Sequence, residues 1–236
     1  MRPMTDANRT EKIVCLGTSI TLGAPYASRE DAYPAILERS INERFGAAGM
    51  QVEVINSGVG GHNTVEGLAR IGPDVLDHQP DLVVIEFSCN DVRWEPNKRV
   101  ELDQFKRNLL EMARLIGDTG ADMIITTPSP IVDAFHPYSL DIDYYDPWGG
   151  CNNALMEYDA PIREVAAERG LMLCDIRAAF EELALGAEFA GRIADASDLR
   201  CLVEYIRPED GVHPTLAGQR VYALALYRIL RERYLR

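Results

Sequence analysis

The stretch that decides the fold is KIVCLGTSIT, residues 12–21. The apolar run at 13–16 passes directly into the small and hydroxyl-bearing residues of GTSIT at 17–21, and a segment of helical period follows at 32–48. A short buried strand, a polar turn and a helix in this order are typical of a βαβ unit. The stretch therefore predicts a parallel sheet, with the polar turn at the carboxyl end of a strand, where ligands bind in such sheets.

The same alternation continues along the rest of the sequence. Further short apolar runs lie at 52–55, 82–87, 123–126 and 171–174. Segments of helical period lie at 64–78, 99–117, 152–169, 176–186 and 214–235. Strands joined by crossover helices predict a mainly parallel five-stranded sheet with helices on both faces. We therefore expect an α/β fold, a three-layer α/β/α sandwich of the flavodoxin-like type, with the last helix packed on the sheet.

Length and composition fit one domain that spans residues 1–236. Hydrophobic residues make up 47% of the 236 residues and charged residues 26%, as in ordinary globular proteins. Two long segments interrupt the alternation, at about 127–151 and at about 187–210. Insertions of this length are usually lids, binding loops or disordered segments.

Charge and cysteine usage exclude several classes of partner. The formal net charge of -13 would repel phosphate backbones and anionic lipid surfaces, so we expect neither a nucleic acid nor a membrane partner. The cysteines are odd in number, scattered and without C-x-x-C spacing, which predicts reduced thiols and no zinc site. They are Cys15, Cys89, Cys151, Cys174 and Cys201. The polar residues 1–12 do not resemble a signal peptide, so a cytoplasmic location is expected.

Ser19 is the candidate nucleophile. It follows the first strand, in a turn that would expose its hydroxyl near free backbone N–H groups. A capping serine is the alternative interpretation, because serine is common at helix starts. A serine hydroxyl also needs a base, and the histidines available are His62, His78, His136 and His213.

Two of these histidines stand three residues after an aspartate, in DAFH at 133–136 and in DGVH at 210–213. An aspartate at this spacing can hold the imidazole Nδ1–H and leave Nε2 free to take the serine proton. We favour His213 with Asp210, because Pro214 and the terminal helix anchor that loop, whereas His136 lies inside the long insertion. A surface turn is the alternative interpretation of either pair.

The loops after the second and third strands offer donors for an oxyanion. The glycine cluster GVGG at 58–61 lets backbone approach a ligand closely, and Asn90 directly follows the third strand. A tight turn for the glycines and an Asx turn for Asn90 are the alternatives. The cluster lacks the G-x-G-x-x-G spacing of a nucleotide site.

Taken together, four blocks resemble, in order, those of the SGNH (GDSL-like) hydrolase family. They are GTSIT at 17–21, NSGVGG at 56–61, ND at 90–91 and DGVHPT at 210–215. The resemblance covers nearly the whole chain and implies a serine esterase without metal or cofactor. It implies Ser19, His213 and Asp210 as the catalytic triad, and Ser19, Gly61 and Asn90 as oxyanion donors. Gly61 is preferred to Gly58 and Gly60 because it stands five residues after Asn56, as in the family's block.

The chain departs from the family pattern at two positions. Thr18 stands where the family usually has aspartate, and Ser88 stands where it usually has glycine. The Thr18 hydroxyl can still hydrogen-bond within the turn, and Ser88 is small. Neither residue transfers a proton or binds the oxyanion, so we expect activity to persist.

The substrate is expected to be a small-molecule ester, and the insertion suggests its class. Residues 133–148 combine aromatic rings with acids, and Tyr144, Tyr145 and Trp148 are the candidates to stack on a sugar ring. A short-acyl ester such as a carbohydrate O-acetyl ester is therefore favoured. The alternative is that these aromatic side chains only pack the loop down. A lysophospholipase or thioesterase, an acyltransferase and a non-catalytic binding protein remain as other functions.

Overall fold

The computed structural model describes residues 10–141, 143–185 and 201–235. Its five strands form one parallel sheet in the order β2-β1-β3-β4-β5, which confirms the predicted sheet. The strands are β1 (Thr10–Gly17), β2 (Gln51–Gly58), β3 (Leu82–Glu86), β4 (Asp122–Thr126) and β5 (Met172–Cys174). Because all five run in one direction, the loops after β1, β2 and β3 meet at one edge of the sheet.

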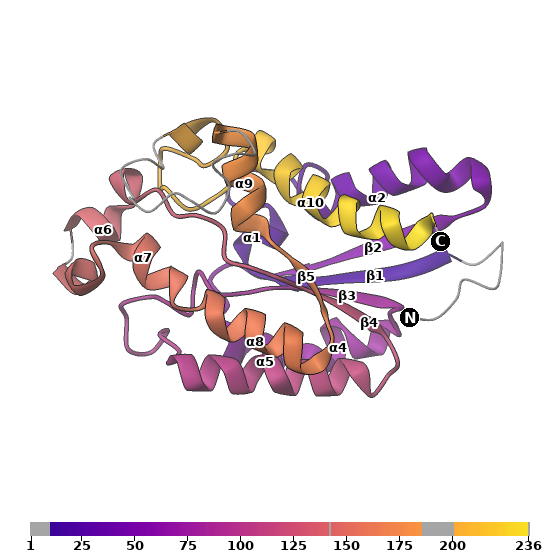
Figure 1. Cartoon of the computed structure of the whole chain (residues 1–236), viewed down its shortest axis with the longest axis horizontal. Helices are drawn as coiled ribbons and strands as arrows, with labels where there is room; N and C mark the ends of the chain where they lie inside the picture. The colour runs from indigo at the N-terminus through magenta and orange to yellow at the C-terminus, as the bar shows by residue number, and fades with distance from the viewer. Residues whose placement is uncertain (1–9, 142, 186–200, 236) are drawn as a thin grey trace.

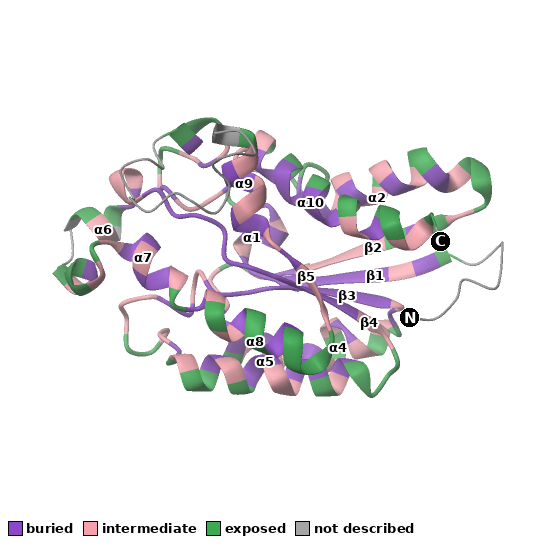
Figure 2. Cartoon of the chain, in the orientation of Figure 1, coloured by how far each residue is buried: buried purple, intermediate pink, exposed green. Residues whose placement is uncertain are grey.

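Helices cover both faces of the sheet, as expected (Figure 1). One layer holds α2 (Tyr33–Phe45, continued by η1, Gly46–Ala48), α9 (Ile176–Leu185) and α10 (Leu216–Tyr234). The other holds α3 (Thr64–Ala69), α5 (Leu102–Gly117) and α8 (Asp159–Arg169). Side chains alternate along β1: Ile13 and Cys15 belong to the core under α2 and α10, whereas Val14 and Leu16 belong to the core over α5. Figure 2 shows the inner strands β1, β3 and β4 buried for most of their length, whereas the edge strands β2 and β5 are largely of intermediate burial.

Two of the predicted helices are each broken by a proline. Residues 64–78 form α3, α4 (Ile71–Asp74) and η2 (Leu76–His78), and residues 152–169 form α7 (Cys151–Met156) and α8. A proline ring clashes with the carbonyl of the residue four positions earlier. For Pro73 that residue is Ala69, where α3 ends, and for Pro161 it is Glu157, directly after α7. The prolines therefore account for both breaks.

The insertion at 127–151 folds into short helical segments beyond the carboxyl ends of the strands (Figure 1). They are η3 (Asp133–Phe135), α6 (Pro137–Asp141) and η4 (Asp143–Trp148). The second long segment, predicted at about 187–210, falls outside the described residues from 187 to 200. After it, an isolated bridge between Ile206 and Pro214 leads the chain into α10.

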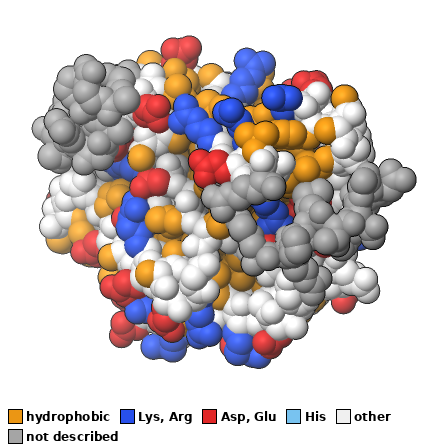
Figure 3. Space-filling model, turned by 45° about the vertical axis from the view of Figure 1, so that its right-hand side comes forward, with side chains coloured by type: hydrophobic (Ala, Val, Ile, Leu, Met, Phe, Trp, Pro, Cys, Tyr) orange, Lys and Arg blue, Asp and Glu red, His pale blue; other side chains and the backbone are white. Residues whose placement is uncertain are grey.

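Both signs of charge lie on the surface, and the described cysteines are free thiols. Acidic and basic side chains lie interspersed on the face shown in Figure 3. No helix in the described ranges combines the length and the apolar character that a membrane span requires. Cys15, Cys151 and Cys174 are buried thiols, and burial raises the pKa of Cys15 to about 12.

Candidate active site

Ser19 lies in a tight turn between β1 and the short helix α1 (Ser19–Leu22). Thr18 caps this helix, and its Oγ1 accepts a hydrogen bond of 3.2 Å from the backbone N–H of Ile20. Gly58 lets β2 approach the turn closely, because an added Cβ there would lie 2.2 Å from the backbone nitrogen of Leu22. The turn therefore presents Ser19 at the carboxyl edge of the sheet.

Ser19, His213 and Asp210 lie in one hydrogen-bonded line. The Oγ of Ser19 is 2.8 Å from Nε2 of His213, and Nδ1 of His213 is 2.7 Å from Oδ2 of Asp210. The other carboxylate oxygen, Oδ1, accepts the backbone N–H groups of Val212 and His213 at 2.9 Å each. Partial burial opposes ionisation of Asp210, but these hydrogen bonds outweigh it and lower its pKa to about 2. The carboxylate is thus ionised and fixes the imidazole orientation at neutral pH.

The loop that carries Asp210 and His213 is supported by the insertion. Val132 donates its backbone N–H to the carbonyl of Gly211 at 2.8 Å. Gly211 has a φ of 69°, and an added Cβ would lie only 2.5 Å from the carbonyl oxygen of Val132. Glycine is therefore needed at this position for both its conformation and its close contact.

The second histidine of the D-x-x-H type, His136, lies close enough to Asp210 to interact with it electrostatically, but its side chain bonds Ser139. It is 6% exposed, and its Nδ1 is 2.9 Å from Oγ of Ser139, which in turn donates to Asp133. Burial lowers the pKa of His136. The structure thus joins Ser19 to His213, as the sequence favoured, and gives His136 other partners.

The loops after β2 and β3 bring Gly61 and Asn90 together. The side-chain amide of Asn90 donates to the backbone carbonyl of His62, directly after Gly61. Gly61 has a φ of 75°, a left-handed conformation that favours glycine. Among the described residues, the backbone N–H groups of Gly60 and Gly61 donate to no acceptor. An added Cβ on Gly60 would lie 3.9 Å from Cβ of Ser19, so this loop borders Ser19.

The departures at Thr18 and Ser88 have different structural consequences. Thr18 is fully buried, and its hydroxyl donates to the carboxylate of Glu86 at 2.8 Å, so the turn still contacts a carboxylate. Ser88 has a φ of 147°, a backbone region that L-residues other than glycine rarely adopt. This conformation explains the family's preference for glycine, and the small side chain of Ser88 is buried there.

Tyr26 is a residue of the site that no sequence pattern indicated. Its ring meets the imidazole of His213 edge to face, with centroids 5.7 Å apart. The guanidinium of Arg207 also lies over the Tyr26 ring, 4.9 Å from its centroid. Burial and the neighbouring Asp210 raise the pKa of Tyr26, so the hydroxyl remains a proton donor at neutral pH.

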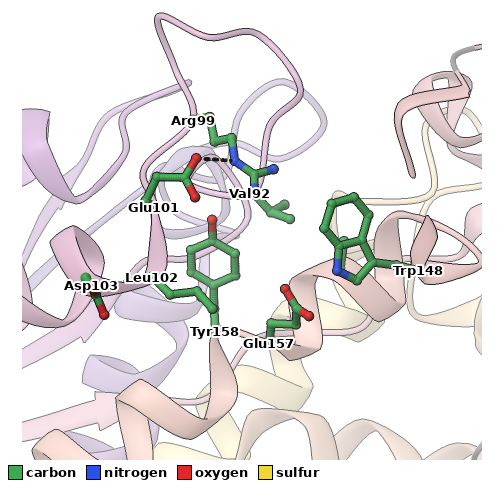
Figure 4. A pocket seen from close by; sticks show the side chains of 9 residues that line it. Val92, Arg99, Glu101, Leu102, Asp103, Trp148, Glu157 and Tyr158 are labelled. Atoms are coloured by element: carbon green, nitrogen blue, oxygen red, sulfur yellow. Dashed lines mark hydrogen bonds and ion pairs between the residues drawn. The ribbon is translucent and has the colours of Figure 1, made fainter. Parts of the chain in front are cut away.

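The aromatic residues predicted to hold a sugar have other partners. Tyr145 is 2% exposed, so its ring has no surface left for stacking, and that part of the prediction is not supported. The Arg99 guanidinium lies over the rings of Tyr144 and Trp148, 5.4 and 5.8 Å from their centroids. Trp148 also borders a hollow of about 320 Å³ between the start of α5 and the end of α7 (Figure 4). The hollow is lined by Val92, Arg99, Glu101, Leu102, Asp103, Trp148, Ala154, Glu157 and Tyr158.

Gln219 joins α10 to the turn that carries Ser19. Its side chain is 1% exposed, donates to the carbonyl of Ile20 at 3.0 Å and accepts the backbone N–H of Tyr33 at 2.8 Å. Thr215 caps the same helix through its hydroxyl, which accepts from Gly218. The helix that follows His213 is thus joined directly to the helix that starts at Ser19.

A parallel α/β sheet that carries a serine, a histidine and an aspartate in contact at its carboxyl edge is the arrangement of an ester-bond hydrolase. The family comparison agrees with this class. The model of the GDSL-like lipase/acylhydrolase family matches residues 15–221, and the chain belongs to that family, as its sequence blocks predicted.

Individual relatives are consistent with the assignment. An arylesterase of Vibrio mimicus is 37% identical over 118 residues, which cover 49% of this chain and 54% of that protein. The match thus spans about half the length of the arylesterase. The crystal structure of a lipase/acylhydrolase from Enterococcus faecalis is similar with a TM-score of 0.69 and 25% identity, covering 95% of this chain and 97% of that one. An acetyl xylan esterase structure shares the fold, with a TM-score of 0.69, 22% identity and coverage of 92% and 98%.

Proposed function

We propose that this protein is a serine esterase that hydrolyses carboxylic esters with Ser19 as nucleophile. The observation that carries the proposal is the hydrogen-bonded line from Ser19 Oγ to His213 Nε2 at 2.8 Å and from His213 Nδ1 to Asp210 at 2.7 Å. A hydroxyl is a weak nucleophile unless an adjacent base removes its proton, and this line supplies such a base. Membership of an acylhydrolase family supports the same chemistry.

In the acylation step, Ser19 Oγ attacks the ester carbonyl carbon while His213 Nε2 takes its proton. Asp210 stabilises the resulting imidazolium, which is why the low pKa of this carboxyl matters. The carbonyl oxygen becomes an oxyanion and accepts hydrogen bonds from the backbone N–H groups of Ser19 and Gly61 and from the Asn90 amide. The imidazolium then gives its proton to the leaving alcohol, and the acyl group stays on Ser19.

In the deacylation step, the same groups act on water. His213 takes a proton from a water molecule that attacks the acyl carbon, and the oxyanion forms again against the same donors. Collapse of the intermediate releases the carboxylic acid and returns the proton to Ser19. No further group is needed for the cycle.

We further propose a short acyl group and a hydroxyl-bearing alcohol, such as an O-acetylated sugar. Aromatic and polar side chains lie near the triad, since Tyr26 borders His213, Arg207 lies over the ring of Tyr26 and Asn90 bonds the loop of Gly61. Rings and hydrogen-bonding groups of this kind can stack on a sugar and bond its hydroxyls, whereas a long acyl chain would need an apolar groove. The rings of Tyr144 and Trp148 contact the Arg99 guanidinium, so they are not assigned to sugar binding.

Hydrolysis of p-nitrophenyl acetate, butyrate and octanoate by wild type and Ser19→Ala tests both parts. We expect the greatest kcat/KM on acetate and a loss of about 10³-fold or more in the variant, with unchanged circular dichroism. Ser40→Ala is the matched control, because the Ser40 hydroxyl bonds the carbonyl of Ile36 within its own helix, α2. Turnover that survives in Ser19→Ala would remove the serine mechanism, and a preference for octanoate would remove the short-acyl assignment.

An acyltransferase would use the same acyl-enzyme and differ only in the acceptor. Free acetate and acetylated product can be measured together while xylose or glycerol is added to the p-nitrophenyl acetate reaction. For an esterase, acetate release equals p-nitrophenol release at every acceptor concentration. Acetate that falls while acetylated acceptor rises would assign the transferase activity instead.

A further inference from the structure

We propose that Glu86 is a positioning residue for the nucleophile, which holds the turn of Ser19 in the geometry that attack requires. The proposal rests on the proposed function, because it concerns the same serine. Glu86 is the last residue of β3 and is 4% exposed, yet the reaction cycle itself does not use it. A buried acid at this place therefore calls for a separate role.

One carboxylate oxygen of Glu86 bonds the chain on both sides of Ser19. Its Oε2 accepts the backbone N–H of Thr18 at 3.1 Å, the hydroxyl of Thr18 at 2.8 Å and the hydroxyl of Thr21 at 2.9 Å. Thr18 precedes Ser19, and Thr21 follows it by two residues. Rotation of the turn about Ser19 would thus break hydrogen bonds at both of its ends.

The backbone around Glu86 is shaped to admit this contact. Gly17 stands opposite Glu86 in the pairing of β1 with β3. A Cβ added to Gly17 would lie 2.1 Å from Oγ1 of Thr21 and 2.8 Å from Oε2 of Glu86. In the GTSIT stretch, Gly17, Thr18 and Thr21 therefore all serve the contact with Glu86, while Ser19 is left for chemistry.

Tyr33 orients the hydroxyl of Thr21 toward the carboxyl group of Glu86. Thr21 gives its only hydroxyl proton to Glu86, so it accepts at Oγ1 from the hydroxyl of Tyr33, 3.0 Å away. Tyr33 is fully buried, as is Thr21. Burial raises the pKa of Glu86, and the bonds from Thr18 and Thr21 oppose that rise. Three donors directed at one oxygen form the pattern that an ionised carboxylate accepts, and such bonds are stronger than neutral ones.

Fixation of the turn matters because the distance from Ser19 Oγ to His213 Nε2 is a narrow requirement. A displacement of about 1 Å at a reacting atom can lower a rate by about 10²-fold. The carboxylate comes from the neighbouring strand, at the turn where position 18 carries threonine. Glu86 with Thr18 thus supplies this turn with a hydrogen-bonded anchor.

The test compares Glu86→Gln with the wild type and with Glu11→Gln. Glutamine keeps the size and one acceptor oxygen but removes the charge. We expect kcat on p-nitrophenyl acetate to fall about 10- to 100-fold with KM within about twofold, and the rate of Ser19 labelling by a fluorophosphonate to fall in parallel. Glu11→Gln removes another buried carboxylate of the β1 region, the partner of Arg233 at 2.8 Å, and is expected to lower the Tm but not kcat.

A second pair keeps the test decisive if Glu86→Gln does not fold. Thr21→Val removes the hydroxyl without changing the shape, and Thr21→Ser keeps it. We expect Thr21→Val to lower kcat and the labelling rate, and Thr21→Ser to restore most of both. Equal kcat in the two Thr21 variants and the wild type would overturn the proposal.

The outcomes also separate this proposal from the proposed function. Wild-type kcat and labelling rate in folded Glu86→Gln, with no turnover in Ser19→Ala, would overturn only the role of Glu86. A kcat that follows the Tm equally in Glu86→Gln and Glu11→Gln would reduce Glu86 to a stability role. Turnover in Ser19→Ala would remove the nucleophile and both proposals with it.

Discussion

The side-chain amide of Asn90 donates a hydrogen bond of 2.9 Å to the backbone carbonyl of His62. This bond joins the loop after β3 to the loop after β2, which carries Gly61. An amide has two N–H bonds, so one can hold His62 while the other serves an oxyanion. The contact thus sets the distance between two of the proposed oxyanion donors.

Replacement of Asn90 by alanine should therefore affect the transition state more than the fold. We expect kcat/KM on p-nitrophenyl acetate to fall about 10²- to 10³-fold, the usual cost of one lost oxyanion donor. Asn42→Ala is the matched control, since it also removes an amide bond to a backbone carbonyl, that of Val52 at the opposite end of β2. The oxyanion role is wrong if the two variants lose activity to the same extent.

The two D-x-x-H histidines should respond differently to replacement by alanine. His213→Ala should lower kcat about 10³-fold or more, because it removes the base bonded to Ser19. His136→Ala should lower the Tm by leaving a cavity beside Ser139 and keep kcat within a fewfold of the wild type. Steady-state kinetics with parallel thermal unfolding measures both. The reverse order would make His136 the catalytic base.

Tyr26 should tune the site through its ring more than through its hydroxyl. Tyr26→Phe keeps the ring beside His213 and leaves the bonds from His213 and Val212 to Asp210, so a decrease in kcat of only a fewfold is expected. Tyr26→Ala should raise KM more strongly, because it removes the ring beside His213 and the stacking surface of Arg207. Separate kcat and KM values on p-nitrophenyl acetate check this. A larger loss of kcat in Tyr26→Phe than in Tyr26→Ala would contradict it.

Asp91 should make the stability of the fold depend on pH. It is fully buried, accepts from Thr64 through Oδ1, and its Oδ2 has no hydrogen-bond partner among the described residues. Burial raises its pKa from 3.8 to about 7 in spite of the bonds from Thr64. The folded state therefore holds a proton that the unfolded state has released, so the free energy of unfolding should fall as pH rises from about 4 to about 7 and then level off.

Urea unfolding of wild type and Asp91→Asn at pH 5 and pH 8 measures this dependence. Asparagine does not titrate, so the variant should lose less stability between the two pH values than the wild type does. The same decrease in both proteins would show that other groups cause the dependence. Asp175→Asn is a control, because hydrogen bonds and Arg163 outweigh the burial of Asp175 and lower its pKa.

The order of strands and helices could be predicted from the sequence because it depends on local patterns. Apolar runs and helical periods marked the five strands and the long helices, whereas the breaks before Pro73 and Pro161, the short helix α1 and the helical segments of the insertion were not predicted. Both breaks follow from a local steric rule, so the prolines were the available signal. The pairing of Asp210 with His213 was predictable for the same reason, since three residues separate them.

The remaining parts of the site depend on contacts between distant segments. Glu86 bonds Thr18 across 68 positions, and Tyr26 meets His213 only because the chain returns after α9. No periodicity encodes such contacts. Glu86 nevertheless left a signal, because an acid at the end of the otherwise apolar run 82–87 is costly to bury without partners. The aromatic residues of the insertion were a misleading indication of a sugar site, since Tyr145 is buried in the hydrophobic core.

The hydrogen bonds of Gln219 to Ile20 and Tyr33 join α10 to segments near the start of the sequence. The proposed nucleophile, Ser19, and the proposed base, His213, are therefore far apart in the sequence and meet only in the folded protein. During synthesis, the nucleophile turn leaves the ribosome long before Asp210, His213 and α10 do. Under the proposed mechanism, the nascent chain has no catalytic activity until α10 docks beside α2 and brings His213 to Ser19. Ester hydrolysis would then report directly that α1 and α10 have come together.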